Sequence, residues 1–141
     1  MVVPRRGGCE LACTRCGEVC PTGALTRLAA SRKTGYDGLP PVSIGTAFFD
    51  RGRCLPWANQ IPCIVCEEMC PTDPKAITLT VAEERRPDGT AVRLQKPQVV
   101  PSRCVGCGIC ENRCPVGELA AIRVSSVGET RDPLNRMVLG S

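Results

Sequence analysis

The chain has 141 residues, of which 12 are Cys, 14 are Gly and 13 are Pro, whereas His is absent and aromatic residues make up only 3%. A short chain with so few aromatic side chains cannot rely on a large packed core, so we expect cysteine chemistry to hold together a loop-rich fold. The formal charge is +4, and no apolar run approaches the roughly 18 residues of a membrane-spanning helix, so we expect no transmembrane segment.

The first of three cysteine groups lies near the N-terminus and is closed by Pro21. Its members are Cys9, Cys13, Cys16 and Cys20. We assign residues 1–42 to a segment built around this group. Within it, Arg32 to Pro41 is rich in Gly, Pro and Lys, which predicts a surface loop.

The second group lies between two predicted strands, Gly45 to Phe49 and Ala76 to Val81, which are short runs rich in β-branched and aromatic residues. Its members, closed by Pro71, are Cys54, Cys63, Cys66 and Cys70. Eight residues separate the first two cysteines, and this insertion carries Trp57, the single tryptophan. We expect Trp57 to shield the site from water; a role in docking or electron tunnelling is the alternative.

The third group follows a charged Pro-Asp-Gly turn, residues 83–90, which predicts a solvated hairpin tip. Strands are predicted on either side of the group, at Gln98 to Val100 and at Ala121 to Val124. The cysteines, closed by Pro115, are Cys104, Cys107, Cys110 and Cys114. Residues 126–141 lack a clean period and are expected to form an extended C-terminal arm.

The three groups form an internal repeat. Each ends in Cys-Pro, and 33 residues lie between Cys20 and Cys54, as between Cys70 and Cys104. The flanks also match, because each Cys-Pro is followed by small turn residues and then by aliphatic residues. Such matched flanks distinguish a structural repeat from cysteine-rich low complexity.

The spacing of the third group, two, two and three residues followed by Pro, is typical of cubane iron–sulfur clusters. A disulfide framework is disfavoured, since residues 1–6 lack the apolar core of a secretory signal. Zinc sites prefer paired Cys-x2-Cys knuckles and commonly recruit His, whereas this chain has no His and its cysteines come in fours closed by Pro, so zinc is also disfavoured.

The net charge also changes when clusters are bound. Three [4Fe-4S] clusters with four thiolates each add a charge of about −6, which brings the loaded protein to about −2. The excess Arg and Lys therefore compensate cluster charge, and we expect no nucleic-acid partner.

The elements predict an α+β fold with pseudo-twofold βαβ repeats, in which the first strand pairs with the last and the second with the third. Residues 43–125 resemble the bacterial two-cluster ferredoxin along their whole length. The resemblance implies crossed ligation, with each Cys-Pro cysteine serving the cluster of the other group. One cluster would take Cys54, Cys63, Cys66 and Cys114, and the other would take Cys70, Cys104, Cys107 and Cys110.

The stretches CLPWANQIPCIVCEEMCP, CVGCGICENRCP and AAIRVSSVGETR resemble the polyferredoxins that accompany periplasmic nitrate reductase and methylamine dehydrogenase systems, and the ferredoxin-like end of membrane-anchored redox proteins. Members of that family usually carry a fourth cysteine group upstream of the first one here. The first group therefore leaves three options. Its four cysteines hold one cluster, or they pair with the second group, or a fourth group completes them from upstream or from another chain.

The resemblance implies a relay of single electrons through three clusters, without catalysis by the chain itself. The partner would be a redox enzyme subunit of a larger complex, with membrane anchoring left open. The location would be cytoplasmic or at the membrane through that partner, and the periplasmic face is also left open. Two alternatives are a zinc-ribbon binding module and an iron–sulfur subunit whose clusters serve only folding.

Overall fold

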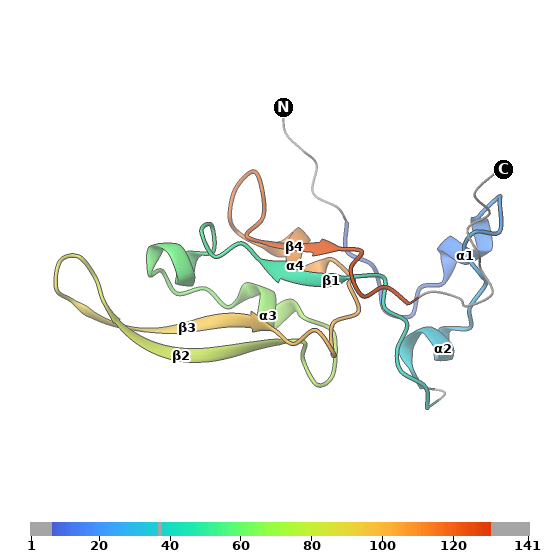
Figure 1. The fold of residues 1–141 in the computed structure, drawn as a ribbon, viewed down its shortest axis with the longest axis horizontal. Coiled ribbons are helices and arrows are strands. Elements are labelled where there is room, and N and C mark those ends of the chain that lie inside the picture. Colours follow the sequence, from blue (N-terminus) through green and yellow to red (C-terminus); the bar gives the residue numbers. More distant parts are fainter. Residues whose placement is uncertain (1–6, 37, 131–141) are drawn as a thin grey trace.

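The structure is a computed structural model that describes residues 7–36 and 38–130. The molecule is elongated, with a long hairpin at one end and the first two helices at the other (Figure 1). It is a small α+β fold of short helices and antiparallel strands. The elements are α1 (Arg15–Val19), α2 (Ala30–Thr34), β1 (Thr46–Phe49), the π-helix η1 (Leu55–Asn59), α3 (Val65–Met69), β2 (Ile77–Arg85), β3 (Ala91–Val99), α4 (Ile109–Arg113) and β4 (Ile122–Ser125).

The strands form two antiparallel pairs, β1 with β4 and β2 with β3. In the first pair Phe49 lies opposite Ile122, and in the second Ile77 lies opposite Val99. The predicted pairing of the first strand with the last and of the second with the third is confirmed. The inner faces of both pairs contribute to one small core, in which Ala47, Ile77 and Ile122 are buried together with several cysteines.

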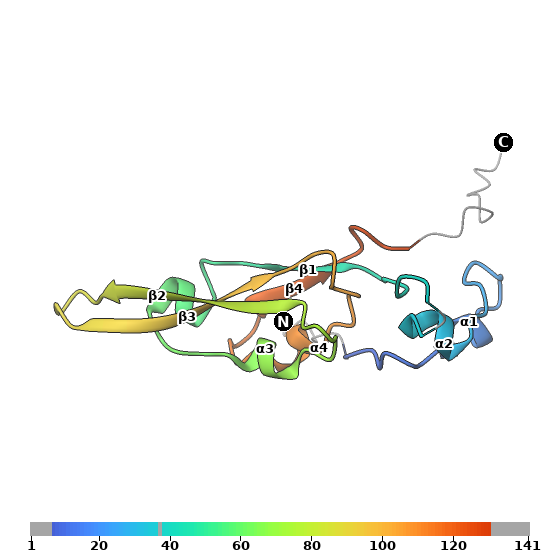
Figure 2. The same cartoon turned by 90° about the horizontal axis from the view of Figure 1, so that it is seen from below.

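Three of the helices, α1, α3 and α4, have the same length and the same place in the repeat. Each carries the third cysteine of its group and ends at the fourth, which has extended backbone angles. The cause is the proline that follows, because its ring disfavours the helical conformation of the preceding residue. Helices α3 and α4 contact each other and lie side by side in Figure 2.

The β2–β3 hairpin is longer than the sequence predicted. Residues 83–85, expected in the turn, pair with residues 91–93, so only the short segment between Arg85 and Ala91 forms the tip. An ion pair between Lys96 and Glu84 joins the two strands. The side-chain amide of Gln60 donates a hydrogen bond to Glu84 at 3.1 Å, so the insertion of the second group supports the hairpin.

The N-terminal segment docks on the rest of the chain without a core of its own. Among its described residues, 7–36 and 38–42, none is buried. It touches the third group where the backbone N–H of Cys9 donates to the carbonyl of Cys107 at 2.6 Å. A Cβ at Gly8 would lie 2.7 Å from a side-chain carbon of Ile109, so this approach requires glycine. The predicted loop from Arg32 to Pro41 is wrong in part, because α2 extends to Thr34.

The start of the C-terminal arm lies beside the entry to β1. The backbone N–H of Thr130 donates to the carbonyl of Ser43 at 2.7 Å, and the N–H of Ser43 donates back to the Thr130 hydroxyl at 3.0 Å. The remainder of the predicted arm, and the Val2-Val3 stretch, lie outside the described residues. In the described part of the chain, no helix is long and apolar enough to cross a lipid bilayer.

Candidate metal centres

The first cavity gathers cysteines from two different groups. Three come from the second group and one from the third: Cys54, Cys63, Cys66 and Cys114. The space between them, including the open solvent at its mouth, is about 310 Å³. Apolar side chains line the rest of it, among them Phe49, Leu55 and Ile122. The lining contains no charged side chain.

The second cavity repeats this arrangement with the groups exchanged. Its cysteines are Cys70 from the second group and Cys104, Cys107 and Cys110 from the third. The space is about 330 Å³, and Ala47, Ile77 and Val124 line it. The backbone also approaches closely here, since a Cβ at Gly106, whose φ is +73°, would lie 2.5 Å from the backbone nitrogen of Gly45. Glycine is required at position 106 for both reasons.

The exchange of the fourth cysteine has a local cause. The third cysteine of each group is on a short helix, whereas the fourth leaves the helix with an extended backbone before proline. Its side chain therefore diverges from the other three of its group. Because α3 and α4 lie in contact, the diverging Cys70 and Cys114 each reach the cavity of the other group.

Thiolates in these cavities require a positive counterpart. Burial, together with the neighbouring Cys54 and Cys63, raises the pKa of Cys66 to about 12. Burial likewise raises the pKa of Cys110 to about 12, with Cys107 as the next cause. Four such sulfurs cannot be ionised together without a cationic group among them. A metal centre supplies that charge and deprotonates its thiol ligands.

The residues present fit a cluster better than a single ion. Within residues 7–36 and 38–130, no three His, Cys, Asp or Glu side chains converge closely enough to hold one metal ion. Four sulfurs instead surround an apolar space in each cavity. A cubane iron–sulfur cluster takes four thiolates in this way, and it supplies one-electron chemistry when bound.

Hydrogen bonds reach the sulfurs of the second cavity. The backbone N–H of Ala47 donates to Cys104 Sγ at 3.3 Å, and the hydroxyl of Thr72 lies 3.2 Å from Cys70 Sγ. Burial alone raises the pKa of Cys70, but the Thr72 hydroxyl and the backbone N–H groups of Thr72, Ala76 and Ile77 outweigh it and lower that pKa. The thiolate of Cys70 is thus favoured by donors aimed at it.

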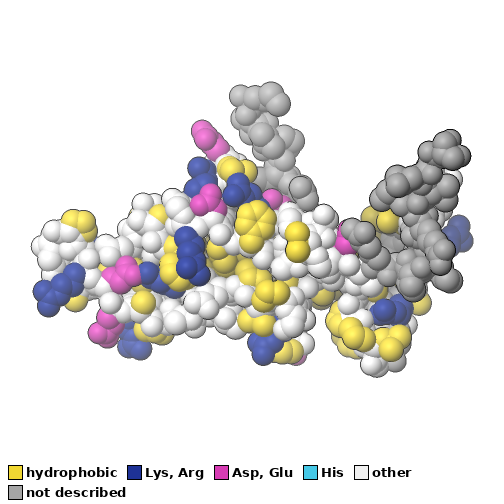
Figure 3. Space-filling model, in the orientation of Figure 1, with side chains coloured by type: hydrophobic (Ala, Val, Ile, Leu, Met, Phe, Trp, Pro, Cys, Tyr) yellow, Lys and Arg dark blue, Asp and Glu magenta, His cyan; other side chains and the backbone are white. Residues whose placement is uncertain are grey.

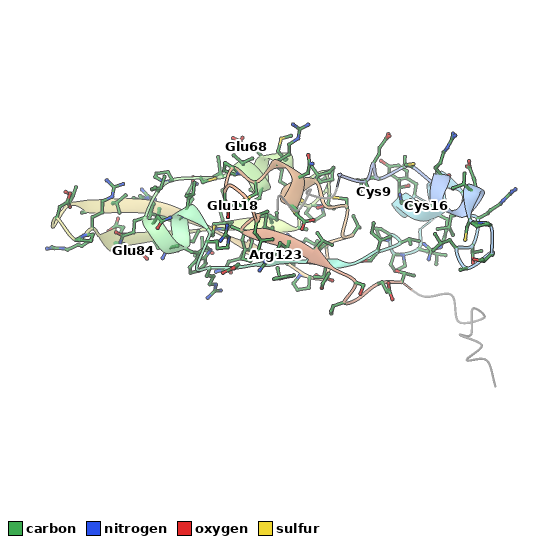
Figure 4. The ribbon with its side chains drawn as sticks, turned by 90° about the horizontal axis from the view of Figure 1, so that it is seen from above. Cys9, Cys16, Glu68, Glu84, Glu118 and Arg123 are labelled. Atoms are coloured by element: carbon green, nitrogen blue, oxygen red, sulfur yellow. The ribbon has the colours of Figure 1, made fainter. Side chains whose placement is uncertain are left out.

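The first cysteine group is more open than the other two. Cys13 and Cys16 are exposed, while Cys9 and Cys20 are half-buried. Figure 4 shows Cys9 and Cys16 at the end of the molecule that carries α1 and α2, away from the hairpin that holds Glu84. Lys33 on α2 fastens this loop, since its ammonium donates to Cys9 Sγ at 3.4 Å and also to the carbonyl of Cys13.

Cys20 resembles Cys70 in its surroundings. The backbone N–H of Leu25 and the hydroxyl of Thr22 lower the pKa of Cys20 to about 7, and the hydroxyl lies 3.6 Å from its sulfur. The Cys-Pro-Thr sequence thus places the same donor beside the fourth cysteine in the first and second groups. Cys20 is suited to ligate a metal as a thiolate.

The insertion of the second group covers one side of the first cavity. Trp57 packs against the core there, and its indole N–H donates to the carbonyl of Pro97 at 3.0 Å. The guanidinium of Arg51 lies 4.1 Å from the ring centre and the ammonium of Lys96 lies 4.8 Å from it. Such contacts between cations and aromatic rings are favourable, so the tryptophan is held by the backbone of β3 and by two cationic side chains.

Comparison with known proteins defines the class to which this arrangement belongs. Residues 61–118 match the family described as the 4Fe-4S dicluster domain. The match begins after Cys54, which the structure nevertheless places in the first cavity. This part of the chain is therefore a 4Fe-4S dicluster domain of the ferredoxin type.

Three similar proteins are all named as ferredoxin-type proteins. The chain is similar to the ferredoxin-type protein NapG of Haemophilus influenzae, with 36% identity over 109 residues, which cover 77% of this chain and 36% of the relative. It is similar to the methylamine utilization ferredoxin-type protein MauM of Methylorubrum extorquens, with 34% identity over 128 residues, which cover 87% of this chain and 52% of the relative. NapG of Escherichia coli shares 37% over 109 residues, 77% of this chain and 43% of the relative.

The chain thus spans between about a third and a half of the length of these relatives. No solved structure matches the chain significantly.

Several residues around the cavities were not singled out from the sequence. Thr72 and Lys33 contact sulfurs or the carbonyls beside them, and Arg53 contacts the loop after Cys114. The sequence contains a signal for Thr72 and for Arg53, because Thr follows Cys-Pro in two groups and Arg precedes the first cysteine in two groups. The contact of Lys33 joins residues more than 20 positions apart, so no local sequence pattern predicts it.

Proposed function

We propose that the chain relays single electrons through three [4Fe-4S] clusters to or from a partner redox enzyme. The observation that carries the proposal is the composition of the two cavities. Each combines three cysteines of one group with the Cys-Pro cysteine of the other. Such crossed ligation is the pattern of two-cluster ferredoxins, whose clusters exchange one electron each.

Two of the clusters lie in residues 43–125, the two-cluster ferredoxin-like domain with its pseudo-twofold repeat. The third is held in the N-terminal segment, residues 1–42, with ligands from Cys9, Cys13, Cys16 and Cys20. The lowered pKa of Cys20, which hydrogen bonds from Leu25 and Thr22 produce, supports a ligand role for this half-buried cysteine. A fourth cysteine group, from the same polypeptide or from another chain, is the alternative partner of this segment.

The partner is a redox enzyme subunit, and the chain itself performs no catalysis. The class of the relatives, one of which is named for methylamine utilization, supports this part of the proposal. The apolar side chains that gather on the surface of the N-terminal segment support a protein partner on that side (Figure 3). They include Val19, Leu25, Tyr36 and Leu39, which are 64%, 54%, 89% and 54% exposed. Patches of this kind mark interaction sites.

Metal analysis of protein purified without oxygen tests the proposal. We expect about 12 iron and about 12 sulfide per chain, little zinc, and clusters that dithionite reduces by one electron each. A colourless protein that contains zinc would contradict the relay. Iron that dithionite does not reduce would assign the clusters to folding instead.

A further inference from the structure

A pair of arginines links the two halves of residues 43–125 in a matched way. Arg53 directly precedes Cys54, and Arg103 directly precedes Cys104. The turns that present them are equivalent. The N–H of Arg53 donates to the carbonyl of Asp50 at 3.1 Å, and the N–H of Arg103 donates to the carbonyl of Val100 at 3.0 Å. Both arginines therefore start from the same place in the repeat, in the turn that follows β1 or β3.

The side chain of Arg53 crosses to the other half. Its Nε donates to the carbonyl of Leu119 and its NH2 group to the carbonyl of Gly117, each at 3.1 Å. These carbonyls belong to the loop that follows Cys114. The loop is bent, since Glu118 between them has a φ of +60°, a conformation that costs energy for a residue with a side chain. One half-buried guanidinium thus holds both sides of a strained turn; Glu118 is labelled in Figure 4.

Arg103 makes the corresponding contact in the other direction. Its NH1 group donates to the carbonyl of Lys75 at 3.4 Å. Lys75 lies five residues after Cys70, as Leu119 lies five residues after Cys114. This is a single and longer hydrogen bond, so it is weaker than the two hydrogen bonds of Arg53.

We propose that Arg53 and Arg103 are positioning residues that hold the crossed cysteine of each cluster site in place. Each arginine joins the first cysteine of a cavity to the loop behind the fourth, which comes from the other repeat. The inference rests on the proposed function, because it assigns these contacts to cluster retention. The first cysteine group lacks such a residue, since Gly8 precedes Cys9.

The alternative role for these arginines is charge compensation, and the two roles separate experimentally. A lysine keeps the positive charge but cannot hold two carbonyls as the planar guanidinium does. Arg93 on the exposed face of β3 is the matched control, because it carries the same charge away from both cavities.

The experiment measures iron release from the full chain to a ferrous chelator, without oxygen, for the unmodified protein and for R53A, R53K, R103A and R93A. In R53A we expect about four of the irons to leave on the order of tenfold faster, because two hydrogen bonds to the loop are lost. The other irons leave at the unmodified rate. R103A accelerates a different set of about four by a smaller factor, and R93A changes nothing.

R53K decides between the two roles and also serves if R53A does not assemble its clusters. Release in R53K that stays within about threefold of R53A supports positioning, whereas a rate restored to that of the unmodified protein assigns the effect to charge and overturns the proposal. Equal acceleration of all the irons, or no acceleration in any arginine variant, also overturns it. A failure of the proposed function is distinct, because the unmodified protein would then either contain no iron to release or contain iron that dithionite does not reduce.

Discussion

Residues 43–125 and the N-terminal segment use the same cysteine repeat in different surroundings. In the former, two groups face each other across contacting helices, and Cys66, Cys110 and Cys114 are buried. In the latter, a single group has only its third cysteine on a short helix, and no described residue of 7–36 or 38–42 is buried. The local sequence pattern makes the helix and the extended Cys-Pro in both regions. What differs is the presence of a second group to supply the crossed cysteine.

The comparison shows that the repeat unit is not a complete site. The first three cysteines of a unit line one cavity, and the proline after the fourth turns that cysteine away from it. Two units that face each other complete both cavities, because each unit supplies the fourth cysteine of the other. A lone unit either bends around one cluster or requires a partner, and a surface rich in exposed apolar side chains is consistent with such a partner.

The largest expected effect separates the two regions directly. Replacing the four cysteines of the first group by Ser in the full chain should lower the iron content from about 12 to about 8 per chain, since only one of three clusters loses its ligands. The ferredoxin-like domain keeps its own eight cysteines and should retain both reduction steps. Iron analysis with a dithionite titration measures this, and loss of all iron would mean that the regions do not bind their clusters independently.

A smaller effect concerns the protection of the first cavity. Trp57→Ala should destabilise the insertion by about 3 kcal/mol, the low end for a large aromatic residue, because the side chain is only half-buried. The cluster of Cys54, Cys63, Cys66 and Cys114 should then decay faster in air than its neighbour. Trp57→Phe keeps an aromatic ring without the hydrogen bond to Pro97. The decay rate of this cluster should then lie between those of the unmodified protein and of Trp57→Ala. Optical bleaching of the separate clusters follows this, and equal decay of both would show that the tryptophan does not shield one site.

The smallest effect is a shift in one reduction potential. The Thr72 hydroxyl oxygen accepts a hydrogen bond from the N–H of Ala76 at 2.8 Å. The hydroxyl proton of Thr72 can therefore be donated to Cys70 Sγ. Donation to sulfur stabilises the more negative, reduced cluster, so Thr72→Val should lower that potential by on the order of 40 mV, the equivalent of about 1 kcal/mol for one electron.

Matched variants sharpen this prediction. Thr72→Ser keeps the hydroxyl and should restore the potential. Val116 occupies the corresponding place after Cys114, so Val116→Thr should raise the potential of the other cluster. Redox titration followed by EPR measures both. A shift of both clusters in either variant would indicate a general change in structure instead of a bond to one sulfur.

The strand pairs were predictable because their signals are local. Short apolar runs flank each cysteine group, and the repeat indicates which runs are equivalent. The full length of the hairpin was not predictable, since Glu84 in the expected turn is stabilised by Lys96 and by Gln60. Those partners are 12 and 24 positions away, and no sequence pattern joins them.

The composition of the cavities was predictable only through the known ferredoxin pattern. Spacing indicates a cluster, but which group supplies Cys70 or Cys114 depends on the packing of α3 against α4. The contacts of Arg53 with the carbonyls of Gly117 and Leu119 are of the same kind, because they join positions more than 60 residues apart. Repeated Arg-Cys pairs mark the residue, whereas only the fold reveals its partner.

Crossed ligation is the central claim, and single Cys→Ser variants test it most directly. Serine changes the potential of the cluster that it ligates, so each variant identifies one of the two reduction steps of residues 43–125. The account predicts that Cys114→Ser alters the same step as Cys66→Ser, and that Cys70→Ser alters the same step as Cys110→Ser. If Cys114→Ser instead altered the step that Cys110→Ser alters, each group would hold its own cluster and the account would be wrong.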